Sequence, residues 1–219
     1  ESRLDDLIAG VENARVGYLQ AAKALSESRK QAASALAAAI EGQIRKMNMP
    51  HAEMAIEIEY DETRKPAGIG LDTIEMTVST NPGQPKDRLD KVVSGGELSR
   101  IGLAIQVIAS DQHAVPTMIF DEVDTGISGP TASIVGNLLR QLGKRGQVMC
   151  VTHLPQVAAQ AHNQLFVTKL TDGESTETRM LALTQQDRVD ELARLLAGDK
   201  VTESALANAR ELLKSAESN

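Results

Sequence analysis

The sequence predicts an α/β protein with a long N-terminal helix, an antiparallel hairpin and a largely parallel sheet with flanking helices. Three observations predict this fold. Residues 2–47 keep a helical pattern that no proline interrupts. Two segments with alternating apolar and polar residues follow. Beyond residue 94, short apolar runs alternate with amphipathic segments, which is typical of a parallel sheet covered by helices.

The long helix carries a repeating apolar seam. Positions seven residues apart, and their companion positions, are Leu4, Val11, Tyr18, Leu25 and Ala32, and Leu7, Ala14, Ala21, Ser28 and Ala35. A coiled coil and an amphipathic helix packed on its own domain share this spacing, so the pattern leaves both open. Because the helical pattern is already present at the first residues, we expect the chain to be a fragment of a longer protein.

The hairpin follows the end of the helix near Pro50. Residues 54–60 and 74–78 alternate like half-buried strands, and a linker rich in proline and glycine joins them. This pattern indicates antiparallel pairing with a long loop. Residues 81–83 (Asn-Pro-Gly) mark a turn, and a polar loop is expected to extend to about residue 92.

Helices and strands alternate in the rest of the chain. Helices are expected over residues 94–110, 130–143, 155–161, 187–197 and 202–215, and strands over 117–120, 147–152, 165–167 and 179–183. The strands over 117–120 and 147–152 consist mostly of a continuous apolar run, so we expect them to be buried. The last two strands are expected to turn through residues 172–173 (Asp-Gly).

The composition disfavours several function classes. Aromatic residues make up 2% of the chain, which disfavours single-strand binders that stack bases on aromatic side chains. The net charge of −7 disfavours a basic sleeve for nucleic acid. The one cysteine, Cys150, excludes an intrachain disulfide, fits a reducing cytoplasm and is expected to be a buried small hydrophobe. No apolar run reaches the roughly 18 residues that a membrane span needs.

The first candidate site opens the helix at residue 94. Ser94 and Glu97 have the spacing of a capping box, which is the purely structural interpretation. Gly95 and Gly96 add a feature that a cap does not need. Without Cβ atoms, they let a ligand approach the free N–H groups of a helix N-terminus, which favours a phosphate.

Two further candidate sites follow predicted strands. Asp121 and Glu122 end the strand over 117–120, where ligands of an open α/β sheet gather. The first carboxylate suits nucleotide-bound Mg²⁺ and the second suits activation of water, although an acidic strand exit is the alternative. Thr152 and His153 end the strand over 147–152, so His153 is either a phosphate sensor or a structural histidine. No G-x-x-x-x-G-K-[ST] loop is present, so the chain is not a complete P-loop ATPase.

The order of these motifs resembles the C-terminal half of an ATPase head of the SMC-like ABC class. Residues 93–100 resemble its signature motif, 119–122 its Walker B strand, 123–129 its D-loop and 151–153 its switch-histidine strand. Within the class, residues 80–83, 94–105, 120–130 and 152–158 are similar to the bacterial RecN family of DNA repair proteins. The resemblance extends over nearly the whole chain. Ser128 departs from the Asp found in many SMC-class D-loops, which puts the detailed D-loop contact in doubt.

The resemblance implies a role for each candidate residue. The nucleotide-binding residues that it implies are Ser94, Gly95, Gly96, Glu97 and Asp124. The signature residues would contact the γ-phosphate of ATP held by the opposite head of a dimer, and Asp124 would lie near the dimer seam. Asp121 would hold Mg²⁺, Glu122 would polarise the attacking water and His153 would sense the γ-phosphate.

The resemblance also implies partners. Residues 1–48 would be the end of a coiled-coil arm, and residues 49–219 the C-terminal lobe of the head. The N-terminal half of the same protein would supply the Walker A lobe, so the fragment alone is expected to be inactive. A homodimer would form through ATP-sandwiched heads, DNA would be bound by the full-length protein in the cytoplasm, at the nucleoid, and no membrane is expected.

Three functions compete at this stage. The first is an ATPase of DNA double-strand break repair, in which ATP binding drives head dimerisation and hydrolysis drives release. The second is a nucleotide-gated DNA tether or clamp of the SMC type in which turnover is secondary. The third is a transporter nucleotide-binding domain, which the long helix and hairpin before the signature motif disfavour.

Overall fold

A computed structural model describes residues 2–109, 115–171, 176–198 and 200–218. The contacts divide the chain into two units, one formed by Glu1–Arg45 and His51–Val93 and the other by Lys46–Pro50 and Ser94–Asn219. This division differs from the expected boundary near residue 48. The hairpin belongs with the long helix because its apolar face packs on that helix.

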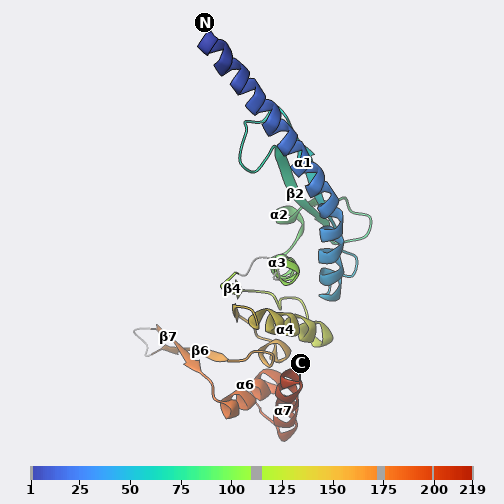
Figure 1. Ribbon diagram of the computed structural model, residues 1–219. Helices are drawn as coiled ribbons and strands as arrows, with labels where there is room; N and C mark the ends of the chain where they lie inside the picture. The colour runs from blue at the N-terminus through green and yellow to red at the C-terminus, as the bar shows by residue number, and fades with distance from the viewer. Residues whose placement is uncertain (1, 110–114, 172–175, 199, 219) are drawn as a thin grey trace. The chain divides into compact units, whose positions relative to one another are not determined.

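The first unit is built on α1, a single helix over Ser2–Lys46, as the proline-free pattern predicts (Figure 1). Its N-terminal half is exposed, including Leu4, Leu7 and Val11 of the seam. The face that α1 buries farther along consists of Ala22, Ser26, Ala33, Ala37, Ile40 and Ile44. The seam residues Ala32 and Ala35 lie outside this face and are exposed. The heptad positions therefore do not mark the face that α1 buries.

The predicted hairpin is confirmed. β1 (Glu53–Tyr60) pairs antiparallel with β2 (Asp72–Ser79) in a register that places Met54 opposite Val78 and Ile56 opposite Met76. Since residues opposite each other share a face, the apolar side chains of both strands lie on one side of the sheet.

The loop expected up to residue 92 contains two short elements that the sequence does not reveal. β3 (Asp87–Arg88) pairs with β2, and α2 (Leu89–Val92) follows it directly. Neither has apolar periodicity. Polar contacts accompany them instead, including the ion pairs of Arg88 with Glu75 and Asp90 and of Lys91 with Asp87. Arg88 and Lys91 are thus engaged within the unit.

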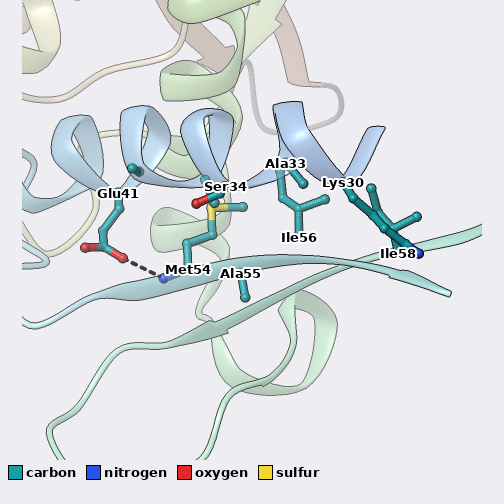
Figure 2. A pocket seen from close by; sticks show the side chains of 10 residues that line it. Lys30, Ala33, Ser34, Glu41, Met54, Ala55, Ile56 and Ile58 are labelled. Carbon is teal, nitrogen blue, oxygen red and sulfur yellow. Dashed lines mark hydrogen bonds between the residues drawn. The ribbon is translucent and has the colours of Figure 1, made fainter. Parts of the chain in front are cut away.

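Several polar contacts fasten α1 to the hairpin. Arg29 forms a 2.6 Å ion pair with Asp72, whose side chain is fully buried. Glu41 accepts a 3.0 Å hydrogen bond from the backbone N of Met54 (Figure 2). It also forms a 2.7 Å ion pair with Arg45. An open groove of about 430 Å³ lies between α1 and β1, and small residues of the helix and apolar residues of the strand line most of it.

The second unit alternates helices and strands as predicted. Its elements are α3 (Gly95–Ala109), β4 (Thr117–Phe120), α4 (Gly129–Gly143), β5 (Gln147–Cys150), α5 (Pro155–Ala158), β6 (Leu165–Thr171), β7 (Thr176–Ala182), α6 (Gln185–Ala197) and α7 (Glu203–Glu217). β4 and β5 pair in parallel, and β6 and β7 pair antiparallel. The parallel sheet is confirmed but is smaller than expected, a single pair among the described strands. The turn expected at residues 172–173 lies outside the described residues.

The expectation that β4 and β5 are buried is wrong for this chain. Ile119 is 68% exposed and Val151, directly after β5, is 63% exposed, and Met149 is exposed as well. Phe120, by contrast, is buried. The physical reason is that no element among the described residues covers the side of the pair on which these apolar side chains stand.

The C-terminal helices have a small core of their own. α6 and α7 pack around Leu192, Ala193, Ala205 and Ala209. Thr184 caps α6 through a full capping box with Asp187, whose pKa is lowered by the hydrogen bonds from Thr184. Within the described part of the chain, no helix combines the length and the hydrophobicity that crossing a membrane requires.

Candidate functional site

The first part of the site is the turn that follows β4. The backbone N of Glu122 donates to Asp121 Oδ1 at 2.9 Å, and the N of Thr125 donates to Glu122 O at 3.0 Å. Glu122 adopts a φ of 56°, in the left-handed region that residues other than glycine rarely occupy. The turn leaves both carboxylates exposed at the carboxyl end of β4, where the sequence places them.

The second part is the start of α3. The N and Oγ of Ser94 both donate to Glu97 Oε2, at 2.8 and 2.9 Å, and the N of Glu97 reaches Ser94 Oγ at 3.4 Å. The capping box inferred from the sequence is therefore confirmed. In this arrangement the Ser94 hydroxyl and the Glu97 carboxylate are engaged with each other.

The two glycines join these parts into one site. A Cβ on Gly95 would overlap Oε2 of Glu122. A Cβ on Gly96 would lie 3.0 Å from Thr125 Cβ and 3.1 Å from the carbonyl oxygens of Glu122 and Thr125. The close approach of α3 to the backbone of the turn thus favours glycine at position 96, whereas the end of the Glu122 side chain can move away from a Cβ at position 95. The signature residues and the acidic pair, which lie far apart in sequence, meet here.

Arg100 is a residue of the site that sequence reasoning missed. It is buried, and its Nη1 donates to the carbonyl oxygens of Thr125 at 2.7 Å and Val123 at 3.4 Å. Burial lowers the pKa of its guanidinium. The signal that could have revealed it is its position four residues after Gly96, which puts it on the same helix face. Arg100 ties the turn after β4 to α3.

The third part joins the ends of the two parallel strands. Asp124 is 2% exposed, and its Oδ2 accepts from Thr152 Oγ1 at 2.5 Å and from the backbone N of His153 at 3.0 Å. The same oxygen lies 3.2 Å from His153 Nδ1. The expectation that both strand ends share one sheet edge is confirmed, since β4 and β5 pair in register.

Asp124, which the resemblance places near a dimer seam, is buried against the end of β5 within this chain, and its place relative to a second head stays a prediction. One sequence expectation about this region changes. Cys150 is half-buried rather than buried. Burial, and to a lesser extent Asp124 and Asp121, raises the pKa of its thiol to about 12, so the thiol stays protonated and unreactive at neutral pH.

The donor set fits nucleotide-bound Mg²⁺ rather than a self-contained metal centre. Among the described residues, no group of three or more His, Cys, Asp or Glu side chains could hold a metal ion. Asp121 and Glu122 offer carboxylate oxygens at an exposed position. Mg²⁺ commonly takes one or two carboxylates and fills the rest of its shell with phosphate oxygens and water, which this site allows.

The fold defines a class. The chain is similar to a solved Smc head domain with a coiled coil and joint from Pyrococcus yayanosii, with a TM-score of 0.54 and 20% identity over 76% of this chain and 29% of that one. The architecture is thus that of an SMC-type head. No protein-family model matches the chain.

The sequence relatives are more specific. The chain is 49% identical to the DNA repair protein RecN of Vibrio cholerae and 51% identical to that of Haemophilus influenzae, each over 213 residues. These matches cover 97% of this chain and 38% of each relative, so the chain spans less than half of their length. The resemblance indicated by the motifs is confirmed: over nearly its whole length, the chain is homologous to part of the RecN proteins.

Proposed function

We propose that the chain is the C-terminal part of an SMC-like ATPase that acts in DNA double-strand break repair and recombination. The single observation that carries this proposal is the parallel pairing of β4 with β5, which brings the Asp121–Glu122 turn and His153 to one edge of the sheet. The relatives named DNA repair protein RecN support the biological role. The proposal places the protein in the cytoplasm, at the nucleoid.

The site residues then take distinct roles. Bound ATP with Mg²⁺ supplies the phosphoanhydride bond that is cleaved. Asp121 holds the metal, Glu122 orients a water molecule and accepts its proton, and His153 directs its ring toward the terminal phosphate. Glu122 Oε2 lies against Gly95. Glu122 therefore has to turn away before the start of α3 can contact a phosphate.

The proposal also assigns partners, since the sequence contains no G-x-x-x-x-G-K-[ST] loop. In each head, a Walker A lobe from the rest of the polypeptide binds a nucleotide. The γ-phosphate of that nucleotide is contacted by Ser94, Gly95 and Gly96 of the opposite head. ATP binding drives dimerisation of the heads, and hydrolysis drives their release. The exposed seam of α1 belongs to the end of a coiled-coil arm, and DNA is bound by the full-length protein.

The test uses the full-length protein with Glu122→Gln. Because the variant keeps the shape of the side chain but loses the base, ATP turnover should fall by about 10²–10⁴-fold while ATP binding persists. The matched control is Glu177→Gln on β7, whose carboxylate pairs with Arg179 at the surface, and it should leave turnover unchanged. The 219-residue chain alone should not hydrolyse ATP, and adding the N-terminal part should restore hydrolysis. Normal turnover by Glu122→Gln would refute the assignment.

A further inference from the structure

We propose that a small cavity between α4, α6, α7 and the end of α5 is a binding site for phosphate. The cavity has a volume of about 120 Å³, and Arg140 of α4, Arg188 of α6, Glu217 of α7 and His162, which follows α5, are among the residues that line it. None of these residues belongs to the site at the strand ends, so this inference does not depend on the proposed function.

Backbone carbonyl oxygens directly after α5 hold the two arginines. Nη2 of Arg188 donates to Ala161 O at 2.8 Å. Nη1 of Arg140 donates to Gln160 O at 2.7 Å. Oxygens just past the C-terminus of a helix attract cationic donors. Because the two oxygens belong to consecutive residues, the two guanidinium groups lie close to each other.

The positive charge at the cavity is only partly balanced. Arg188 is 6% exposed, and its hydrogen bonds go to uncharged oxygens, including Gln164 Oε1 at 3.4 Å. Among the described residues that line the cavity, Glu217 alone is acidic, and it is exposed. Burial and the charge of Arg140 lower the pKa of the Arg188 guanidinium, and Glu217 opposes them only in part. A buried cation is stabilised by a counter-charge as well as by hydrogen bonds, so the cavity favours an anion.

The arginines also keep donors for such an anion. The bonds of Arg188 use Nε and Nη2, which leaves Nη1 without a partner in the described part of the chain. Nε of Arg140 is buried, and no described residue accepts from it. Guanidinium groups recognise phosphate well, because their planar fork donates to two oxygens at once.

The size of the cavity limits the ligand to a single phosphate group. A water molecule takes about 30 Å³ in the liquid, so 120 Å³ corresponds to about four water molecules. One phosphate group is of comparable size, whereas a nucleotide is much larger. A phosphate dianion would balance the charge of both arginines.

His162 reports on the charge in the cavity. Burial lowers the pKa of its imidazole, and the charges of Arg140, Lys144 and Arg188 lower it further. An anion bound among these cations should offset their effect and raise the pKa of His162. The response of His162 therefore measures binding at this cavity and not elsewhere.

The first experiment follows the histidine signals of the 219-residue chain by NMR, with His162 and His153 assigned by His162→Gln and His153→Gln. Inorganic phosphate should shift the His162 signal until it saturates and should raise its pKa, with sodium chloride of equal ionic strength as the control. The signal of His153 should stay in place. A wild type in which His162 does not respond, or in which only His153 responds, would overturn the proposal. The second of these results would place phosphate at the strand ends instead.

The second experiment measures the affinity for inorganic phosphate by calorimetry. Arg140→Gln should weaken binding by about 10–100-fold, because it removes a charged donor. The control is Arg179→Gln, since Arg179 pairs with Glu177 on β7 and does not line the cavity. It should leave the affinity unchanged. An equal loss in both variants would contradict the proposal.

A variant at the acidic residue of the cavity tests the opposite direction. Glu217→Gln removes the one negative charge of the lining and should strengthen phosphate binding by about 2–5-fold. Glu217 is exposed, so this variant keeps the test valid if Arg140→Gln does not fold. Unchanged or weaker binding by Glu217→Gln would count against the proposal.

Glycerol 3-phosphate distinguishes the two sources of a phosphate group. Weaker binding than that of inorganic phosphate would assign the cavity to the free ion. Equal or tighter binding would assign it to the terminal phosphate of a larger molecule. Both results support a phosphate site, and a His162 signal that responds to neither compound refutes it.

Discussion

The start of α3 contains two residues that lack a side chain. A Cβ at Gly96 would lie 3.0 Å from Thr125 Cβ and 3.1 Å from the carbonyl oxygens of Glu122 and Thr125, whereas a Cβ at Gly95 would meet only the end of the Glu122 side chain, which can move. Gly102, farther along the same helix, has nothing within 4 Å of its Cβ position. The three glycines are the same residue type in one helix, yet their surroundings differ. The surroundings therefore favour glycine at position 96 but not at position 102.

We predict opposite effects for alanine at two of these glycines. Gly96→Ala should destabilise the chain by about 1–3 kcal/mol, because the Cβ meets the backbone carbonyl oxygens of Glu122 and Thr125, of which the Thr125 oxygen is held by Arg100. Gly102→Ala should stabilise it by up to about 1 kcal/mol, since alanine favours the helix. Urea unfolding of the two variants and the wild type measures both effects. Equal effects at the two positions would mean that the turn after β4 adjusts without cost.

At the residue scale, the sequence predicted which side chains meet but not how they contact one another. Asp121, Glu122 and His153 could be placed because the ends of parallel strands share an edge of the sheet. The burial of Asp124 and the bonds of Arg100 could not be predicted. Both depend on the conformation of the turn at Glu122, whose positive φ no residue pattern indicates.

At the scale of elements, apolar periodicity decides what the sequence reveals. α1, α4, β1 and β2 bury apolar faces, and the predicted ranges agree with the structure to within a few residues. β3 and α2 bury little and were missed. The seam of α1 was found, but the helix buries a different face on the hairpin. That choice depends on the hairpin and not on α1 alone.

The contact of α1 with the edge of β1 can be tested at Glu41. Among the described strands, β1 pairs with β2 alone, and Glu41 accepts the N–H of Met54 while it pairs with Arg45. Glu41→Ala should therefore destabilise the chain by about 1.5–3 kcal/mol, as expected for a hydrogen bond to a charged group. Thermal or urea unfolding provides the measurement.

A matched control lies on the same helix. Glu27 forms an exposed ion pair with Lys30 at 3.5 Å, and such pairs contribute less than about 0.5 kcal/mol. Glu27→Ala should change the stability correspondingly little. If Glu41→Ala were equally mild, the bond to Met54 would not fasten the hairpin to α1.

At the scale of the whole molecule, the chain exposes apolar surface that a larger protein is expected to cover. Ile119, Met149 and Val151 stand exposed on a parallel strand pair, a type of sheet that is normally covered on both faces. The sequence predicted buried strands because their apolar side chains favour removal from water. It does not record which part of the polypeptide provides the cover. The chain spans 38% of the length of its RecN relatives, so most of such a protein lies outside it.

We therefore predict that one substitution has opposite consequences in the fragment and in the full-length protein. Ile119→Lys should reduce self-association of the 219-residue chain, because it places a charge in an exposed apolar surface. In the full-length protein the same lysine should be buried without a partner and destabilise the fold by at least about 2 kcal/mol. Ile69→Lys is the control, since Ile69 is 74% exposed in the other unit and should be neutral in both settings. Analytical ultracentrifugation of the fragment and thermal unfolding of the full-length protein give the two readouts. A full-length protein that tolerates Ile119→Lys would show that this face remains open to solvent when the rest of the polypeptide is present.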